Sequence, residues 1–369
     1  MTESGIYSLI RPLLFRLAPE RAHQLTLSAL RAAGRFAPAR WITQTAFSAP
    51  SKPVSAFGLT FKNPVGLAAG YDKDGVALRG LAALGFGHIE IGTVTPLPQP
   101  GNPKPRLFRL VEDEAVINRL GFPSRGSAFV QRQIDRTPAG NWLAELFGTP
   151  GRNKRTQVAR AAQKSAGCIV GVNLGRNKST PNEQAVFDYL ALLQNFAAHA
   201  DYLTINVSSP NTVGLRELQG RQALESLLTQ LHSQRLMEQE RLGRNLPLLV
   251  KLAPDLSEGD LDEAVEVIVR THMDGIIVTN TTLGRDGLRS VHRTEQGGLS
   301  GSPLRSLSEG VLKMVLQRLA GAIPVVSAGG ILSADDAKRR LDMGAALVQV
   351  YTGLVYRGPG LVQAIIKSL

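Results

Sequence analysis

Amide, hydroxyl and ammonium side chains follow the apolar runs of this chain, and their types suit the binding of a flat heterocycle. The run 201–209, DYLTINVSS, carries Asn206 inside a strand-like segment and ends in Ser208 and Ser209, with Asn211 two residues further on. A buried parallel strand is normally a continuous apolar run, so an amide within it requires a reason. Serine and asparagine are also ordinary turn residues, so this stretch alone leaves a plain turn as an even alternative.

Similar residues follow seven other apolar runs, and this recurrence favours one shared site over a set of unrelated turns. Asparagine amides both donate and accept hydrogen bonds, as a heterocycle with alternating carbonyl and N–H groups requires. Lysines can neutralise anions, and glycine-rich strand ends hold phosphate through backbone N–H groups. The residues at these run ends are Gly70, Tyr71, Asp72, Lys73, Thr93, Thr95, Asn173, Lys251, Thr279, Asn280, Thr281, Gly329, Gly330, Tyr351, Thr352 and Gly353. With no carboxylate pair and no Ser-His-Asp arrangement evident, a phosphate-bearing redox cofactor explains the set better than hydrolysis.

The apolar runs alternate with helical patterns, which predicts an α/β fold of the (β/α)8 TIM barrel type. The runs are 64–70, 88–95, 168–175, 201–209, 246–255, 273–282, 322–330 and 345–353. Helical spacing of apolar residues recurs between most of them, at 182–199, 220–241, 261–271, 307–320 and 334–343. In such a barrel the carboxyl ends of all strands open at one mouth, where the polar residues would meet. A doubly wound sheet is the alternative, but the first run lacks the GxGxxG fingerprint of a dinucleotide site.

Composition indicates a soluble, basic protein without a metal site. The chain has 369 residues, of which 43% are hydrophobic and 20% charged. Cys168 is the only cysteine, and the six histidines show no ligand spacing, so an internal disulfide or a metal centre is not expected. The net charge of +12 indicates an anionic partner, which can be nucleic acid, an acidic membrane surface or small anions. Neither a transmembrane run nor a secretory signal is evident, so the protein should remain in the cytoplasm.

Three segments lie outside the expected barrel core. Residues 1–45 show two amphipathic helical patterns separated near Pro19 and rich in arginine, a pattern found in helices that lie on a membrane surface. The alternative, a helical hairpin packed on its own domain, is the interpretation that this segment favours when it is taken alone. Residues 96–131 should form an extended loop or hairpin over one face, and 132–166 a surface insertion. We therefore divide the chain into a helical region, 1–45, and a barrel domain, 46–369.

A series of motifs runs from residue 68 to residue 360 in an order that carries a family resemblance. They are AAGYDKDG (68–75), EIGTVTPLPQPGNPKPRLFRL (90–110), INRLGFPS (117–124), GVNLGRNK (171–178), NVSSPNTVGLREL (206–218), VTNTT (278–282), GGLSGSPL (297–304), AGGI (328–331) and QVYTGLVYRGPG (349–360). In these motifs the chain resembles the membrane-associated, quinone-linked (class 2) dihydroorotate dehydrogenases, FMN enzymes of pyrimidine biosynthesis. The segment 132–166 departs from the family by its length.

The resemblance implies a role for each matched residue. Ser209 would be the base that removes the C5 proton of dihydroorotate, while hydride leaves C6 for the flavin N5. Because a serine hydroxyl has a pKa far above 7, it must relay this proton onward. The pyrimidine and its carboxylate would be held by Lys73, Asn118, Arg119, Leu120, Gly121, Phe122, Asn206, Asn211, Asn280 and Thr281. FMN would be held by Ala69, Gly70, Tyr71, Asp72, Lys73, Thr93, Asn173, Asn206, Lys251, Thr279, Gly301, Gly330, Tyr351 and Thr352.

The resemblance also implies a membrane quinone, ubiquinone or menaquinone, as electron acceptor. Ser209 stands where the related soluble class has cysteine, and this matches the quinone class, as do residues 1–45. In the family this helical region forms a hydrophobic tunnel, and His23 and Arg109 match its polar quinone contacts. The alternatives are a capped helical histidine and a solvated loop arginine. We expect a monomer bound peripherally to the cytoplasmic face of the inner membrane, with no metal and no nucleic-acid partner.

Two other functions stay open beside this one. The first is another FMN-dependent barrel reductase, such as a tRNA dihydrouridine synthase-like enzyme, for which the basic charge would signify RNA binding. The intact set Asn118, Asn206, Asn211 and Asn280 argues against it. The second is a non-catalytic membrane-associated flavin carrier, against which Ser209 and Lys73 argue.

Overall fold

The computed structural model describes residues 6–135 and 168–369, and its central feature is a closed barrel of parallel strands. Around the barrel the strands follow the order β10-β12-β13-β3-β4-β7-β8-β9. Each of them lies within one of the predicted apolar runs, so the (β/α)8 barrel is confirmed and the doubly wound sheet is excluded. Their bounds are β3 Val65–Leu67, β4 His88–Val94, β7 Ile169–Leu174, β8 Tyr202–Asn206, β9 Leu248–Leu252, β10 Gly275–Val278, β12 Val325–Ala328 and β13 Leu347–Val350.

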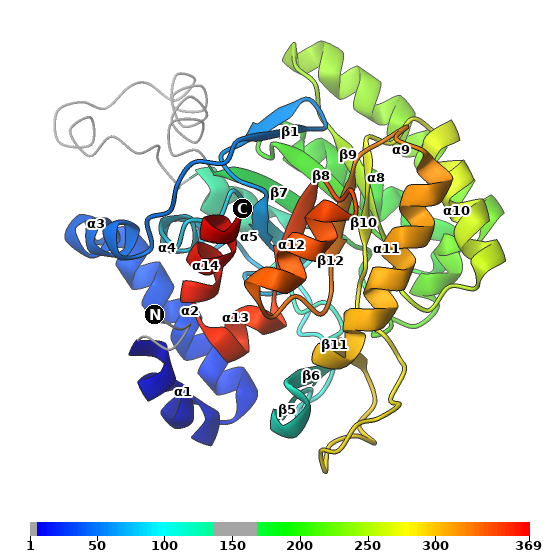
Figure 1. Ribbon diagram of the computed structural model, residues 1–369. Helices are drawn as coiled ribbons and strands as arrows, with labels where there is room; N and C mark the ends of the chain where they lie inside the picture. The colour runs from blue at the N-terminus through cyan, green and yellow to red at the C-terminus, as the bar shows by residue number, and fades with distance from the viewer. Residues whose placement is uncertain (1–5, 136–167) are drawn as a thin grey trace, which may run out of the picture.

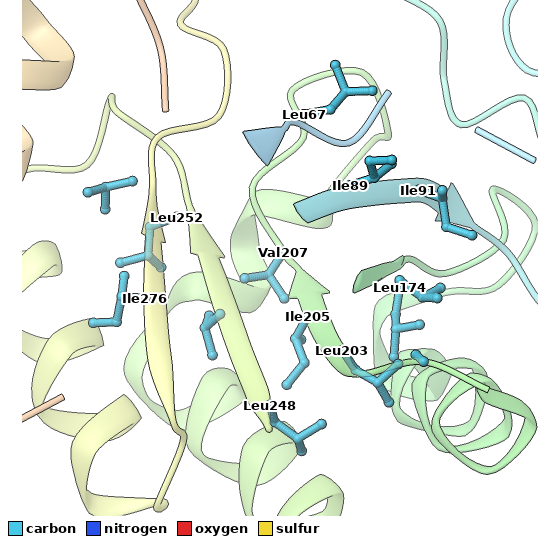
Figure 2. Packing of buried hydrophobic residues seen from close by; sticks show 14 of the residues in the cluster. Leu67, Ile89, Ile91, Leu174, Leu203, Ile205, Val207, Leu248, Leu252 and Ile276 are labelled. Carbon is cyan, nitrogen blue, oxygen red and sulfur yellow. The ribbon is translucent and has the colours of Figure 1, made fainter. Parts of the chain in front are cut away.

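The side chains of a barrel strand point alternately to its two faces and form two separate buried layers. In β8, Leu203 and Ile205 belong to the large apolar core that the barrel shares with its helices, and Figure 2 shows part of this packing. Tyr202 belongs instead to a second apolar cluster. Since successive side chains of a strand point to opposite faces, Thr204 and Asn206 face the barrel interior like Tyr202. The amide inside the apolar run is therefore an interior residue of the barrel.

Helices surround the barrel strands (Figure 1). All five predicted helices are confirmed to within a few residues, and residues 182–184 form a 3₁₀ turn ahead of α8. Local sequence determines where some of these helices begin. Ser257 caps the N-terminus of α10, and Ser333 and Asp336 form a reciprocal cap at the N-terminus of α12. The helices are α4 Leu78–Ala83, α8 Ala185–Ala197, α9 Arg221–Leu242, α10 Glu258–Arg270, α11 Arg305–Leu319, α12 Ala334–Asp342, α13 Thr352–Arg357 and α14 Gly360–Ser368.

A small antiparallel sheet stands apart from the barrel and contains the predicted hairpin. Strands β5 Leu107–Leu110 and β6 Ala115–Asn118 form this hairpin, and β11 Gly298–Gly301 adds to β6 as a third strand. Sequence reasoning missed β11, because a four-residue segment with glycine at both ends carries little strand signal. It also missed helix α5, Ser127–Asp135, and a hairpin of β1 Val54–Ala56 and β2 Leu59–Phe61. The predicted insertion, 132–166, begins within α5, and residues 136–166 lie outside the described residues.

The N-terminal region contains three helices, where the sequence patterns predicted two. They are α1 Ile6–Arg16, α2 Pro19–Arg35 and α3 Ala37–Ala46, and Figure 1 shows them together on one side of the barrel, near α4, α13 and α14. Helix α2 lies very close to α4, since a Cβ atom added at Gly80 would be 2.0 Å from the carbonyl oxygen of Leu30. Within residues 6–135 and 168–369, no helix has the length and apolar character needed to cross a membrane.

Candidate active site

A cavity opens at the carboxyl ends of the barrel strands. It encloses about 980 Å³ of space between protein atoms, its open mouth included. Every barrel strand except β7 contributes a lining residue at or just after its end, as the barrel prediction required. Of the predicted site residues, those that line this cavity are Ala69, Gly70, Lys73, Thr93, Asn118, Leu120, Gly121, Phe122, Asn206, Ser209, Asn211, Lys251, Thr279, Asn280, Thr281, Gly301, Gly330, Tyr351 and Thr352.

Hydrogen bonds between strands fix the orientation of the Asn206 amide. Its Nδ2 donates to Thr93 Oγ1 and to Asn173 Oδ1, both at 2.9 Å. Its Oδ1 accepts from Ser208 Oγ at 3.1 Å and from Asn280 Nδ2 at 3.3 Å. Since each of these groups is itself bonded, rotation of the amide would break several bonds at once. Asn206 thus presents a fixed surface to the cavity.

Ser209 lies in the loop after β8 and is 5% exposed. Its Oγ accepts a hydrogen bond from the backbone N–H of Asn211 at 3.3 Å. The Asn211 side chain continues the contact, because its Nδ2 donates to Asn118 Oδ1 at 3.1 Å. Among the described residues, none accepts a hydrogen bond from Ser209 Oγ. The hydroxyl proton of Ser209 is therefore available to a ligand or a water molecule.

A buried carboxylate, Glu90, organises the floor of the cavity and was missed by sequence reasoning. Glu90 is 0% exposed, and its Oε1 accepts from Asn173 Nδ2 at 2.8 Å. Its Oε2 accepts from Gln349 Nε2 at 3.0 Å, and the Lys251 ammonium lies 4.0 Å from Oε1. Burial lowers the pKa of Lys251, and the negative charge of Glu90 opposes that effect. The signal was present in the sequence, because a glutamate inside the apolar run 88–95 is as anomalous as Asn206.

Lys73 lies at the end of the first strand run, and its ammonium donates a hydrogen bond to the carbonyl oxygen of Gly70. Burial lowers the pKa of Lys73 to about 8, although the Asp74 carboxylate acts in the opposite direction. Desolvation disfavours the charged ammonium, and the attraction of the nearby carboxylates offsets this effect only in part. Lys73 is therefore a cation at neutral pH that an anionic ligand in the cavity would stabilise.

Four of the residues predicted to bind the substrate or FMN do not line this cavity. Asn173 lies behind it, between Thr93 and Glu90. Asp72 is fully buried and accepts hydrogen bonds from the backbone N–H groups of residues 76 and 77, and burial raises its pKa to about 6. The Arg119 guanidinium pairs with Glu295 at 2.6 Å, away from the cavity. The fourth, Tyr71, lines a different cavity.

Glycine-rich turns form one wall of the cavity. Gly329 and Gly330 have φ angles of 103° and 72°, and Gly301 has 101°, in the region that favours glycine. Ser300 Oγ and Thr352 Oγ1 lie 2.8 Å apart beside Gly301. Sequence reasoning did not assign several residues of this lining, which have few distinctive features in isolation: Ala68, Ser300, Leu304, Ala328, Ile331 and Gln349.

A second cavity lies between the N-terminal helices and the barrel and encloses about 1120 Å³, its open mouth included. Most of its lining is apolar, from α1, α2, β5, β6 and α13. Tyr351 lines both cavities, so the two meet at this side chain. The lining is Tyr7, Ile10, Leu14, Phe15, Pro19, Ala22, His23, Thr26, Ala29, Leu30, Tyr71, Leu84, Leu107, Arg109, Val116, Tyr351, Leu354, Val355 and Pro359.

His23 and Arg109 both line the second cavity. Burial lowers the pKa of His23 to about 4, with the positive charge of Lys73 as a smaller cause, so its imidazole is neutral at pH 7. The Arg109 guanidinium donates to the carbonyl oxygens of Leu14 at 3.1 Å and Phe15 at 3.2 Å, and lies 4.5 Å from the centre of the Phe15 ring. Arg109 therefore caps the end of α1 and ties it to β5.

Comparisons with known proteins find relatives along nearly the whole length of the chain. The family model for dihydroorotate dehydrogenase matches residues 52–369. The dihydroorotate dehydrogenase (quinone) of Thiobacillus denitrificans is 46% identical over 365 residues, covering 99% of each chain, and that of Idiomarina loihiensis is 44% identical over 364 residues, covering 99% of this chain and all of its own. A crystal structure of DHODH from Eimeria tenella in complex with ferulenol superposes with a TM-score of 0.79 at 36% identity, covering 94% of this chain and 89% of that chain. The chain therefore belongs to the dihydroorotate dehydrogenase family, in the quinone class that its full-length relatives represent.

Proposed function

We propose that this protein oxidises dihydroorotate to orotate, with FMN as resident cofactor, and passes the electrons to a membrane quinone. The observation that carries the proposal is the meeting of two cavities of opposite character at Tyr351. One is lined by amides, hydroxyls and two ammonium groups, and the other is mainly apolar. A polar substrate and an apolar acceptor can thus approach a shared cofactor from separate sides. The family relationship supports this function over a tRNA dihydrouridine synthase-like enzyme or a non-catalytic flavin carrier.

The lining of the first cavity fits a flavin mononucleotide. Gln349 is 2% exposed, its Nε2 is bonded to Glu90, and its Oε1 lacks a hydrogen-bond partner among the described residues. A buried acceptor left unpaired costs free energy, so a donor from a bound ring would stabilise it. Lys251 offers a positive charge for the ring, and the turns at Gly301 and Gly330 suit a phosphate. When bound, FMN supplies the hydride-accepting centre that the side chains of the chain lack.

The proposal also gives a role to other predicted site residues. Asn118, Asn206, Asn211 and Asn280 would orient the pyrimidine through their fixed amides, and Lys73 would bind its carboxylate. Ser209 Oγ would take the C5 proton and transfer its own proton onward. Asp72 and Asn173 would act on FMN only by holding the residues that touch it. Arg119, paired with Glu295, would support the turn 120–122 that lines the cavity.

We infer that α1–α3 attach the protein to a membrane surface as the helical region 1–45. Their exposed apolar side chains include Leu9, Leu13, Trp41 and Ile42, and Trp41 is 67% exposed. Arginines on the same helices supply the positive charge that anionic lipid head groups attract. The second cavity lies under these helices, so a quinone dissolved in the membrane would enter it without crossing water. We place the protein, as a monomer, on the cytoplasmic face of the inner membrane.

The identity of the cofactor tests this proposal directly. The purified protein should be yellow, and denaturation should release one FMN per chain, identified by its mass and absorbance spectrum. FAD, or an iron–sulfur centre with no flavin, would contradict the assignment of the glycine turns to a terminal phosphate.

Affinity for orotate should weaken as pH rises through the pKa of Lys73. The ammonium is charged below about 8 and neutral above it, so its attraction for the orotate carboxylate is present at pH 7 and lost towards pH 9. The Kd of orotate, read from the change in flavin absorbance, should rise roughly tenfold per pH unit above the transition. Lys73→Arg keeps its charge in this range and should abolish the pH dependence. A wild-type Kd that is constant from pH 7 to 9.5 would remove Lys73 from carboxylate binding.

A further inference from the structure

The inner part of the second cavity contains a group of polar side chains in an otherwise apolar lining. The rings of His23 and Tyr71 meet edge to face with centroids 4.9 Å apart. Thr26 Oγ1 lies 3.5 Å from the Tyr71 hydroxyl. The Tyr71 ring lies edge-on to Tyr351, with centroids 5.8 Å apart, and Tyr351 borders the first cavity as well. Tyr71 is thus next to the side chain at which the two cavities meet.

The Tyr71 hydroxyl makes only a weak hydrogen-bond contact with the described residues. Thr26 Oγ1 donates its own proton to the carbonyl oxygen of His23 at 2.9 Å, so in its contact with Tyr71 it can serve as acceptor only. At 3.5 Å this contact is at the limit of a hydrogen bond and contributes little. Burial raises the pKa of Tyr71, which keeps the phenol protonated at neutral pH. Tyr71 therefore supplies a proton donor to the lining of the cavity, and among the described residues its hydroxyl has only the long contact to Thr26 as acceptor.

Two other polar groups of this cavity are already committed to the protein. The Tyr7 hydroxyl donates to the carbonyl oxygen of Val355 at 2.5 Å. The Arg109 guanidinium donates to backbone carbonyls at the end of α1. A ligand carbonyl would have to compete with these acceptors at Tyr7 and Arg109, whereas at Tyr71 it would meet only the long contact to Thr26.

We propose that the Tyr71 hydroxyl donates a hydrogen bond to a carbonyl oxygen of the quinone head group, making Tyr71 a quinone-binding residue rather than a flavin ligand. This inference rests on the proposed quinone reduction. It reassigns a residue that the sequence motif AAGYDKDG had placed with FMN. The bond would hold the head group beside Tyr351, where the cavity adjoins the cofactor site. The Thr26 hydroxyl would keep its hydrogen bond to the carbonyl oxygen of His23, and the phenol proton would turn from Thr26 to the quinone oxygen.

Tyr71→Phe tests the proposal in the FMN-loaded, full-length protein. It removes one hydroxyl and retains the ring contacts to His23 and Tyr351. With decylubiquinone as probe, the Kd measured by calorimetry and the KM should both rise roughly three- to tenfold, the range of one lost hydrogen bond. FMN content and the rate of anaerobic flavin reduction by dihydroorotate should match the wild type. Tyr356→Phe is the control, because its hydroxyl bonds to the carbonyls of Leu110 and Ala115 outside the cavity lining.

The possible outcomes separate this inference from the function on which it rests. If the wild type does not bind decylubiquinone, the quinone function itself fails. If the wild type binds it and Tyr71→Phe has the same Kd, only the Tyr71 assignment is overturned. Loss of FMN from Tyr71→Phe would instead restore the flavin assignment. A raised Kd in Tyr356→Phe equal to that in Tyr71→Phe would show a general loss of packing and also overturn the proposal.

Discussion

Ser209→Ala is expected to slow flavin reduction by dihydroorotate by at least roughly 10²-fold, the effect of losing a general base. Among the described residues that line the first cavity there is no carboxylate and no histidine, so no ordinary base can replace the serine. FMN should remain bound, because Ser209 is not needed for the turns at Gly301 and Gly330. Anaerobic stopped-flow absorbance of the flavin measures this step without quinone.

Two neighbouring variants sharpen this test. Ser209→Cys places a more acidic group at the same position and should retain more activity than alanine, with a rate that rises with pH. Ser208→Ala removes a hydroxyl that is fully buried and bonded to Asn206 and Asn280, so its effect should be smaller and act on substrate affinity. Near-normal reduction by Ser209→Ala at neutral pH would show that another group accepts the C5 proton.

Removing α1–α3 should separate the two half-reactions. A chain that begins at Pro50 retains every barrel strand and every residue of the first cavity, so FMN binding and reduction by dihydroorotate should persist. The second cavity would lose His23 and the rest of its helical wall, and turnover with quinone should fall by roughly 10²-fold as positioning is lost. Binding to anionic liposomes should weaken in the same variant.

The deletion also exposes the face of α4 that packs tightly against α2, and this exposure can itself damage the protein. A full-length variant therefore provides a second test. Ala29 lines the second cavity, and Ala32 lies on the same helix outside the lining. Ala29→Trp should obstruct the cavity and raise the KM for quinone, whereas Ala32→Trp should behave as the wild type. Full quinone activity in the stable truncated protein would mean that the helices only pack against the barrel.

The sequence was sufficient to predict the barrel because eight apolar runs with helical intervals leave few alternatives. The barrel prediction also placed the separated residues Asn206, Lys251 and Tyr351 at one mouth, because parallel strands share a carboxyl edge. The strand ends alone could not predict the direction of each side chain. Tyr71 directly follows Gly70 in the chain, yet its ring lies in the other cavity. Its position depends on packing against His23 of α2, a contact distant in sequence.

Other features escaped prediction because their signals are not local. Strand β11 is a short glycine-bounded segment that pairs with β6, which lies 180 residues away at the Gly298–Asn118 position. Helix α3 was missed because its start follows α2 with a single residue, Phe36, between them. Glu90 is the exception, because its signal is local: a glutamate within an apolar strand run is as unusual as the asparagine at position 206.

In the function that we propose, dihydroorotate supplies electrons that leave through a membrane quinone. The most direct measurement is the rate of orotate formation by the full-length FMN protein with four acceptors in parallel: ubiquinone, menaquinone, fumarate and NAD. We expect rapid turnover with at least one quinone, inhibition of that turnover in Ala29→Trp, and negligible rates with fumarate or NAD. Rapid orotate formation with fumarate or NAD and none with either quinone would contradict the account.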